Sequence, residues 1–204
     1  GNTRRFGASL DKIKQVVDVR KGEIMFGLNM IVHKGKTIFI GDTTVHEYPT
    51  SEQLAEIAIS TARVVRLFGF DPKVAFVSHS TFGQPLTSRT KHIRNAVDIL
   101  KNKKVDFEFD GDMQPDVALN SDYEELYPFS KLVGKANILI MPGQHSAAIS
   151  YKLMKTIGDT KVIGPLLIGL GLPIEIAPLR SSTSEILNLA SIAAYSSVVI
   201  DYKN

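Results

Sequence analysis

The 204-residue chain contains no cysteine, and it has no long uninterrupted apolar run. Without cysteine there are no disulfides and no thiolate metal sites, which fits the reducing cytoplasm, the localisation we expect. No stretch of about 18 uncharged apolar residues is present, so we expect no membrane partner. The most apolar segment, residues 162–172, is interrupted by glycine and proline.

Several motifs that carry known chemistry are also missing. There is no phosphate-binding Walker loop, no Gly-x-Ser-x-Gly nucleophile motif and no His-Glu-x-x-His metal motif. The segment from Gly169 to Gly171 lacks the third glycine of the dinucleotide fingerprint. The five histidines show no metal-ligand spacing. We therefore expect neither a metal site nor a nicotinamide site in this chain.

The charge balance is mildly basic. The formal net charge is +3, and the basic residues are not concentrated in one run. This excess is compatible with an anionic small ligand. It is too weak to indicate nucleic acid, which we do not expect as a partner.

Strand and helix patterns alternate from about residue 73 onward. This alternation is typical of a mainly parallel sheet with helices on both faces, so we predict an α/β fold with three α/β/α layers. Apolar runs rich in β-branched residues predict strands at residues 23–33, 37–40, 73–77, 105–109, 137–141, 162–169 and 174–177. Helical periodicity predicts helices at residues 9–17, 50–68, 115–120, 122–126, 146–157 and 182–199, and one through residues 93–100.

Local signals indicate where some of these elements begin. Residues 34–36 have the sequence Lys-Gly-Lys and predict a hairpin between the first two strands. Thr50 with Gln53, and Ser182 with Glu185, have the spacing of a capping box at a helix start.

The loops that follow the predicted strands are rich in polar or small residues. In sheets of this kind, ligands bind beyond the carboxyl ends of the strands. The loops at that edge are residues 78–88, 110–114, 141–146 and 178–182. We therefore expect one cleft lined by all four.

The first of these loops is dense in hydroxyl groups and leads into a helix. That helix starts with Arg89, Lys91 and Arg94, although helix N-termini favour acidic residues. An anion bound in the loop resolves this conflict, because hydroxyls, free N–H groups and arginine would converge on it. An ordinary solvated basic face explains the same charges without a ligand.

The segment from Asp110 to Asp112 follows the strand predicted at residues 105–109. Such an acidic pair can bind a metal, but a turn with Gly111 at positive φ and the aspartates as caps is the interpretation we favour. His79 and His145 also fall in strand-end loops. Each of them either lines a pocket or is held by hydrogen bonds.

Four blocks of the sequence, in order along the chain, match one known family. They lie at residues 42–45 with 49–58 (DTTV and PTSEQLAEIA), 77–83 (VSHSTFG), 110–119 (DGDMQPDVAL), and 135–142 with 163–169 (KANILIMP and IGPLLIG). Together these blocks resemble the phosphate acetyltransferase and butyryltransferase family.

Further details are closer to one subgroup of that family. Met113, the Phe82-Gly83 pair and the opening residues 1–6 resemble the C-terminal transacetylase-like domain of bacterial hybrid NADP-dependent malic enzymes. The resemblance implies a phosphotransacetylase-like lobe of the isocitrate and isopropylmalate dehydrogenase type, with an acyl-CoA cleft between two lobes. It also implies that residues 1–204 are a C-terminal fragment of such a domain. Residues 18–172 would form the second lobe, and residues 1–17 and 173–204 would belong to a partly missing first lobe.

The sequence departs from the family pattern at positions that matter for catalysis. In active members of the family a Ser-Arg pair precedes the last helix, and an aspartate at its start acts as base toward the CoA thiol. Here Pro178, Leu179 and Glu185 occupy those positions, and Arg180 lies one position late. Removing a general base typically costs about 10²–10⁴-fold in rate. We therefore expect this chain to share the family's ligand binding but not its catalysis, and we assign no catalytic residue.

The resemblance implies a regulatory domain that binds acetyl-CoA as an allosteric effector and helps to build a homo-oligomer. The residues expected to bind the anion are Ser78, Ser80, Thr81, Gly83 and Arg89, with Gln144, His145 and Ser146 opposite. The malic-enzyme domains, which would convert malate to pyruvate with NADP and Mg²⁺ or Mn²⁺, would lie outside this chain. No cofactor is expected within it.

Two alternatives remain open. The chain is an active phosphate acetyltransferase if Glu185 generates the CoA thiolate and Arg180 replaces the missing clamp. It is a pure oligomerisation module if it binds no acetyl-CoA.

Two helices carry apolar faces that need a partner. In the helix at residues 146–157 we expect Ile149, Leu153 and Ile157 to face inward. If the first lobe is incomplete, a face of the last helix needs a cover, so we expect a subunit contact or an exposed patch there. That face consists of Ile186, Leu189, Ala190 and Ala193.

Overall fold

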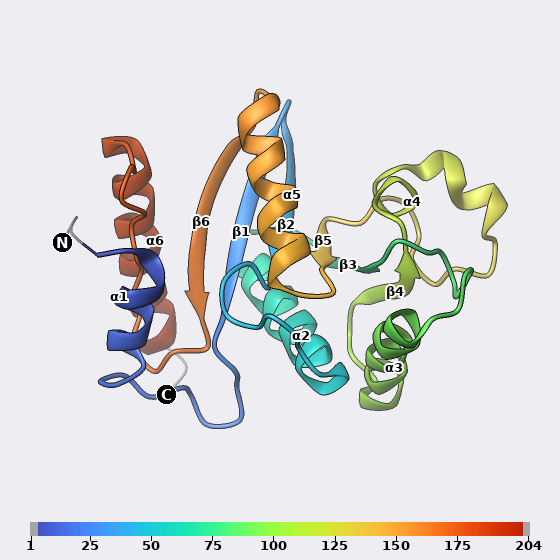
Figure 1. Ribbon diagram of the computed structural model, residues 1–204, viewed down its shortest axis with the longest axis horizontal. Helices are drawn as coiled ribbons and strands as arrows, with labels where there is room; N and C mark the ends of the chain where they lie inside the picture. Colours follow the sequence, from blue (N-terminus) through green and yellow to red (C-terminus); the bar gives the residue numbers. More distant parts are fainter. Residues whose placement is uncertain (1–3, 202–204) are drawn as a thin grey trace.

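A six-stranded sheet forms the centre of the molecule (Figure 1). The computed structural model describes residues 4–201, with side chains through residue 198, so residues 1–3 of the opening segment lie outside the described residues. The strands are β1 (Phe26–His33), β2 (Lys36–Gly41), β3 (Lys73–Val77), β4 (Glu108–Met113), β5 (Ile138–Ile140) and β6 (Lys161–Ile168). Their order across the sheet is β4-β3-β5-β2-β1-β6.

The sheet is mainly parallel, as predicted. β4, β3, β5 and β2 pair in parallel, whereas β1 is antiparallel to both of its neighbours, β2 and β6. The predicted hairpin joins β1 to β2. Lys34 and Gly35 form its turn at φ values of 47° and 76°, as a two-residue hairpin turn requires.

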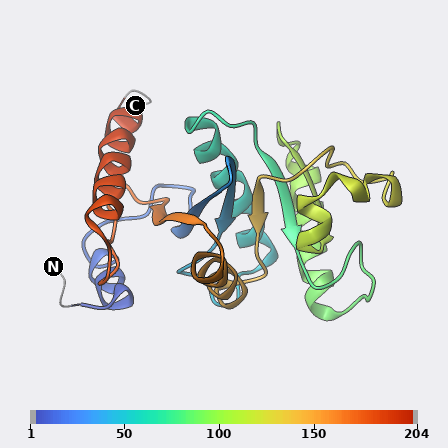
Figure 2. The same cartoon turned by 90° about the horizontal axis from the view of Figure 1, so that it is seen from above.

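Helices cover both faces of the sheet, which confirms the three-layer α/β/α prediction. α2 (Ser51–Leu67) and α3 (Ser88–Lys103) pack on the face that includes Phe39 and Phe76. α5 (Gln144–Ile157) and α4 (Pro115–Leu119) pack on the face that includes Ala75 and Leu139. Figure 2 shows α2 and α5 on opposite sides of the sheet. The strands are therefore buried on both faces, which explains their continuous apolar runs.

Two helices lie side by side at one end of the sheet, beyond β6 (Figures 1 and 2). They are α1 (Phe6–Ile13) and α6 (Thr183–Asp201), and α6 packs on β6. A small third core with Leu10, Leu167 and Ile176 joins α1 to the sheet. The helix predicted at residues 9–17 is α1, which begins and ends earlier than predicted. Val16 lies exposed beyond its end. None of the helices within residues 4–201 is long and apolar enough to cross a membrane.

Both predicted capping boxes are present. The Thr50 side chain accepts a hydrogen bond from the Gln53 N–H at 3.2 Å, and Gln53 Oε1 accepts one from the Thr50 N–H at 2.8 Å. At the start of α6, Ser182 Oγ accepts from the Glu185 N–H at 3.2 Å, and Glu185 Oε2 accepts from the Ser182 N–H at 2.7 Å. The short helices after β4 are also present, as α4 and a 3₁₀ turn, η1 (Ser121–Leu126).

The prediction for the inward face of α5 is wrong. Ile149, Leu153 and Ile157 are 58%, 53% and 82% exposed. The residues that contact the sheet are Ala147, Tyr151 and Met154, a different stripe of the same helix. Apolar residues occur on both sides of this helix, so periodicity alone does not select the buried side.

Two strand predictions need correction. The strand predicted at residues 105–109 is β4, which runs from Glu108 to Met113, so the segment from Asp110 to Asp112 lies within a strand and is not a turn. Its parallel pairing with β3 outweighs the local turn preference of the Asp-Gly-Asp sequence. The strand predicted at residues 174–177 is absent. There the side chain of Glu175 accepts a hydrogen bond from the Leu167 N–H at 3.0 Å, and Ile176 fills the third core.

The apolar face of α6 for which we expected a cover is partly covered within the chain. Leu189 is buried against the main core, whereas Ile186 is about half exposed, Ala190 is exposed and Ala193 is half-buried. The chain therefore leaves part of this face open.

Candidate functional site

The loop after β3 is tied to the end of β4. The Ser78 N–H donates to the Met113 carbonyl at 2.9 Å, and the Phe82 N–H donates to the Asp112 carbonyl at 2.6 Å. The Gln114 N–H donates to Thr81 Oγ1 at 3.2 Å. These bonds place the hydroxyl-rich loop beyond the carboxyl ends of two neighbouring parallel strands, as predicted for a site in this fold.

A tight turn lies in the middle of this loop. Phe82 and Gly83 have φ values of 50° and 80°, and the Gln84 N–H donates to the Thr81 carbonyl at 3.2 Å. Arg94 Nη1 donates to the Phe82 carbonyl at 3.0 Å. A residue with a side chain rarely adopts positive φ, and such positions concentrate at functional sites. Arg94, one of the three basic residues at the start of α3, therefore holds the loop through the Phe82 carbonyl.

Ser80 faces the interior. It is fully buried, its hydroxyl donates to Asp112 Oδ2, and Ser78 Oγ lies 3.3 Å from Ser80 Oγ. Asp112 is fully buried too, and its Oδ1 has no hydrogen-bond partner. The carboxylate of Asp112 thus holds the loop through the Ser80 hydroxyl. The prediction of a turn at Asp110–Asp112 did not anticipate this role.

A cavity of about 630 Å³ lies beside the loop. Thr81 and Phe82 line it, together with Gln114 and Asp110 from the β4 end. Asp110 accepts hydrogen bonds from the Gly111 N–H at 2.9 Å, the Lys131 N–H at 2.7 Å and Ser130 Oγ at 3.3 Å. Arg89, a predicted anion ligand, is exposed on α3 and does not line this cavity.

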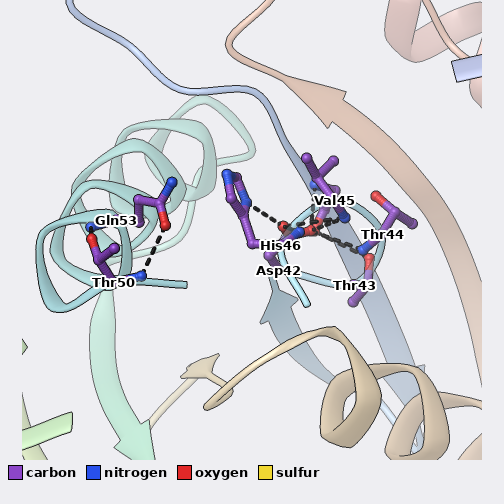
Figure 3. Close-up of polar contacts among 8 residues, drawn as sticks. Asp42, Thr43, Thr44, Val45, His46, Thr50 and Gln53 are labelled. Carbon is purple, nitrogen blue, oxygen red and sulfur yellow. Dashed lines mark hydrogen bonds and ion pairs between the residues drawn. The ribbon is translucent and has the colours of Figure 1, made fainter. Parts of the chain in front are cut away.

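The predicted residues at the start of α5 are supported by a different loop, whose hydrogen bonds to Asp42 are drawn in Figure 3. Asp42, which is buried, accepts hydrogen bonds from the Gly27 and Thr44 N–H groups at 2.9 and 2.8 Å. It also accepts from the His46 N–H and lies 2.7 Å from His46 Nδ1. The His46 carbonyl in turn accepts from the Gln144 N–H at 2.9 Å. Asp42 therefore organises the loop on which α5 begins.

The other two predicted residues there have local roles. Ser146 Oγ donates to the Gly143 carbonyl at 2.9 Å. His145 is exposed, and its Nε2 lies 3.6 Å from Glu47 Oε1. Neither residue lines the cavity beside Thr81.

Arg180 and Glu185 line a separate cavity of about 120 Å³ between β6, α5 and α6. It shares no residue with the cavity beside Thr81, so these two cavities do not form the single cleft expected from the four loops. Lys155 Nζ donates to Glu185 Oε1 at 2.7 Å. This bond, followed by the one from the Ser182 N–H, lowers the pKa of Glu185 below its ordinary value. Glu185 is thus a firmly ionised capping residue.

No group of three histidine, aspartate or glutamate side chains in metal-binding geometry occurs within residues 4–201. Asp42, Tyr127 and Phe129 are not among the residues predicted for the site. Asp42 lies in the first of the four family blocks. The two rings lie in a short aromatic run, Tyr-Pro-Phe, within an otherwise polar connection. That aromatic run is the sequence feature from which these two residues could have been predicted.

Comparison with known proteins agrees with the four sequence blocks. The family profile described as "Phosphate acetyl/butaryl transferase" matches residues 1–194. The NADP-dependent malic enzyme of Rhizobium meliloti is 44% identical over 195 residues, which cover 96% of this chain and 26% of that protein. The phosphate acetyltransferase of Clostridium acetobutylicum is 36% identical over 157 residues, which cover 76% of this chain and 47% of that protein.

A solved structure has the same fold. The phosphotransacetylase from Streptococcus pyogenes superposes with a TM-score of 0.89 at 28% identity, covering 97% of this chain and 61% of that one. The chain spans about a quarter of the length of the malic enzymes that it matches. The sequence blocks, the profile match and the shared fold together show that this chain belongs to the phosphate acetyl/butaryl transferase family.

Proposed function

We propose that the chain is the regulatory domain of a cytoplasmic NADP-dependent malic enzyme. In this proposal it binds acetyl-CoA as an allosteric effector and contributes to a homo-oligomer. NADP and a divalent metal would act in the malic-enzyme part, which converts malate to pyruvate. The 44% identity with a malic enzyme over nearly the whole chain supports this assignment.

The lowered pKa and the hydrogen bonds of Glu185 are the observation that favours a regulatory role over catalysis. A base toward the CoA thiol must take a proton from a group whose pKa is near that of cysteine, about 8.5. Glu185 has a lowered pKa and accepts hydrogen bonds from Lys155 and Ser182, so it is a weak base for this task. Leu179, at the place of the family's arginine, offers no charge to a phosphoryl group.

The loop after β3 supports ligand binding by the same chain. Its Thr81–Gln84 turn borders a cavity of a size typical for small molecules, and basic side chains of α3 lie beside it. Binding without the reacting groups is what an effector site requires, provided that the effector prefers one of two conformations of the whole enzyme.

The test uses the full-length protein that contains this chain. Malate-dependent reduction of NADP is followed at increasing acetyl-CoA, and thermal unfolding is recorded in parallel. We expect the rate to change with acetyl-CoA, and we expect a stabilisation of about 2.7 kcal/mol at 100 times the dissociation constant. No stabilisation at millimolar acetyl-CoA would favour a pure oligomerisation module instead.

A second assay separates regulation from catalysis. Acetyl phosphate and CoA are incubated with the wild-type protein and with Glu185→Gln, which retains an acceptor for the capping box. We expect no acetyl-CoA above background from either protein. Formation at enzyme-like rates, reduced about 10²–10⁴-fold in the variant, would identify an active phosphate acetyltransferase.

A further inference from the structure

The cavity beside Thr81 is a groove with three distinct walls. α3 supplies Arg94, Val97 and Lys101, and the end of β4 supplies Asp110 and Gly111. Residues 126–131, in the connection that follows η1, supply the third wall. Figures 1 and 2 show that this region lies at the opposite end of the sheet from α1 and α6. At about 630 Å³, the groove is within the range of small-molecule sites.

The third wall carries an aromatic cluster. The Phe129 and Phe82 ring centroids are 4.9 Å apart in an edge-to-face arrangement, and Tyr127 lies 5.4 Å from Phe82 and 6.1 Å from Phe129. Although it is held by two rings, Phe129 remains 65% exposed. An aromatic ring that faces a groove is a stacking surface for a planar ligand.

The charges of the groove favour an anion. Lys101 pairs with Asp98 at 2.8 Å, so these two charges offset each other. Asp110 is buried and accepts three hydrogen bonds from its own neighbourhood. Arg94 and Lys131 have no carboxylate within ion-pair distance in the part of the chain that the structure describes, and both line the groove. Arg94, Lys101 and Lys131 together outnumber the two carboxylates of the groove, Asp98 and Asp110, so one net positive charge faces the ligand space.

A planar ring together with phosphate groups is the chemistry of a nucleotide. We propose that this groove binds the nucleotide end of a CoA-type ligand, with the base on Phe129 and phosphate oxygens at Arg94 and Lys131. The choice of CoA as the source of that nucleotide rests on the proposed function. Thr81 and Gln84 line the groove and belong to the predicted anion loop, so the groove and the loop are continuous.

The test is calorimetric titration of the full-length protein with three probes. They are acetyl-CoA, adenosine 3′,5′-bisphosphate and inorganic phosphate. Phe129→Ala is expected to weaken acetyl-CoA and the bisphosphate about 5- to 30-fold, because one base–aromatic stack is lost. Lys131→Ala is expected to weaken both about fivefold, and inorganic phosphate is expected to bind far more weakly than either.

Two matched controls come from the same connection. Val133→Ala removes an apolar side chain about as exposed as Phe129, and Lys135→Ala removes an exposed lysine. Neither residue lines the groove. Both variants are expected to bind the probes within about twofold of the wild type. Unfolding midpoints of all four variants establish that each is folded.

The outcomes separate this inference from the proposed function. If acetyl-CoA binds and the groove variants behave like the controls, the groove assignment is overturned and the proposed function stands. If the bisphosphate binds with the expected variant pattern but acetyl-CoA does not, the groove stands and the effector assignment fails. If inorganic phosphate binds as tightly as the bisphosphate and Phe129→Ala changes nothing, the site recognises a simple anion, and the nucleotide proposal is wrong.

Discussion

Gly83 is the residue that allows the loop after β3 to take its shape. Its φ of 80° belongs to the left-handed region, and a Cβ built there would clash with Arg94 Nη1. The absence of a side chain thus lets the guanidinium approach the turn and bind the Phe82 carbonyl. The basic start of α3 has a structural role at Arg94 in addition to any role toward a ligand.

Gly83→Ala is expected to cost more stability than a matched glycine substitution in the β1–β2 turn. Gly35 has a similar φ of 76°, but nothing lies near its missing Cβ, so Gly35→Ala measures backbone strain alone, about 1–2 kcal/mol. At Gly83 the displaced Arg94 also loses its hydrogen bond, which adds about 1 kcal/mol. Urea unfolding of both variants measures the difference. Equal losses would mean that the Arg94 contact contributes nothing to stability.

At the scale of secondary structure, α5 shows how one helix presents apolar residues on two sides. Its Ala147, Tyr151 and Met154 contact the sheet, while Ile149, Leu153 and Ile157 face away from it. The start of the helix is held by the Asp42 loop through His46 and Gln144. This attachment, and the small side chain of Ala147, orient the helix on the sheet.

Substitutions on the two sides of α5 should therefore differ in cost. Leu153→Gln is expected to change the unfolding free energy by less than about 0.5 kcal/mol, because about half of the residue is already exposed to water. Met154→Gln is expected to cost about 2 kcal/mol, because it loses contacts with the sheet. Chemical unfolding at two protein concentrations tests this. A larger and concentration-dependent loss for Leu153→Gln would show that a second chain covers the outer face.

At the scale of the whole molecule, Glu175 lies where the segment that leads to α6 meets the sheet. Its carboxyl group accepts a hydrogen bond from the Leu167 N–H in β6, and Ile176 beside it fills the third core. Burial raises the pKa of Glu175 to about 8, and the hydrogen bond from Leu167 opposes this rise. The folded protein therefore retains a proton that the unfolded chain loses near the ordinary pKa of this carboxyl group, 4.5.

This difference makes the global stability depend on pH. Because the folded state binds the extra proton, the contribution of Glu175 is complete below the unfolded pKa and is lost as pH rises through about 8. Glu175→Gln keeps an acceptor for Leu167 but does not titrate. The stability of the variant relative to the wild type should rise between about pH 5 and pH 9, by up to about 5 kcal/mol. Unfolding free energies across that range test this, and a constant difference would contradict the assigned titration.

The sequence by itself determined the features that depend on neighbouring residues. The alternation of strands and helices, the turn at Lys34 and Gly35, and the capping boxes of Thr50 and Ser182 all follow from local chemistry. Such signals need only a few adjacent residues, so they survive whatever the rest of the chain does. The family blocks added the fold as a whole, and the structure agrees with them.

The tertiary structure alone decided which side chains meet. Asp112 is buried beneath Ser80 because β4 continues along β3 four residues beyond the predicted strand end. Phe129 reaches the groove only because the connection after η1 folds back onto Phe82. Contacts of this kind join residues far apart in the chain, and their free energy comes from packing and desolvation that no local pattern encodes.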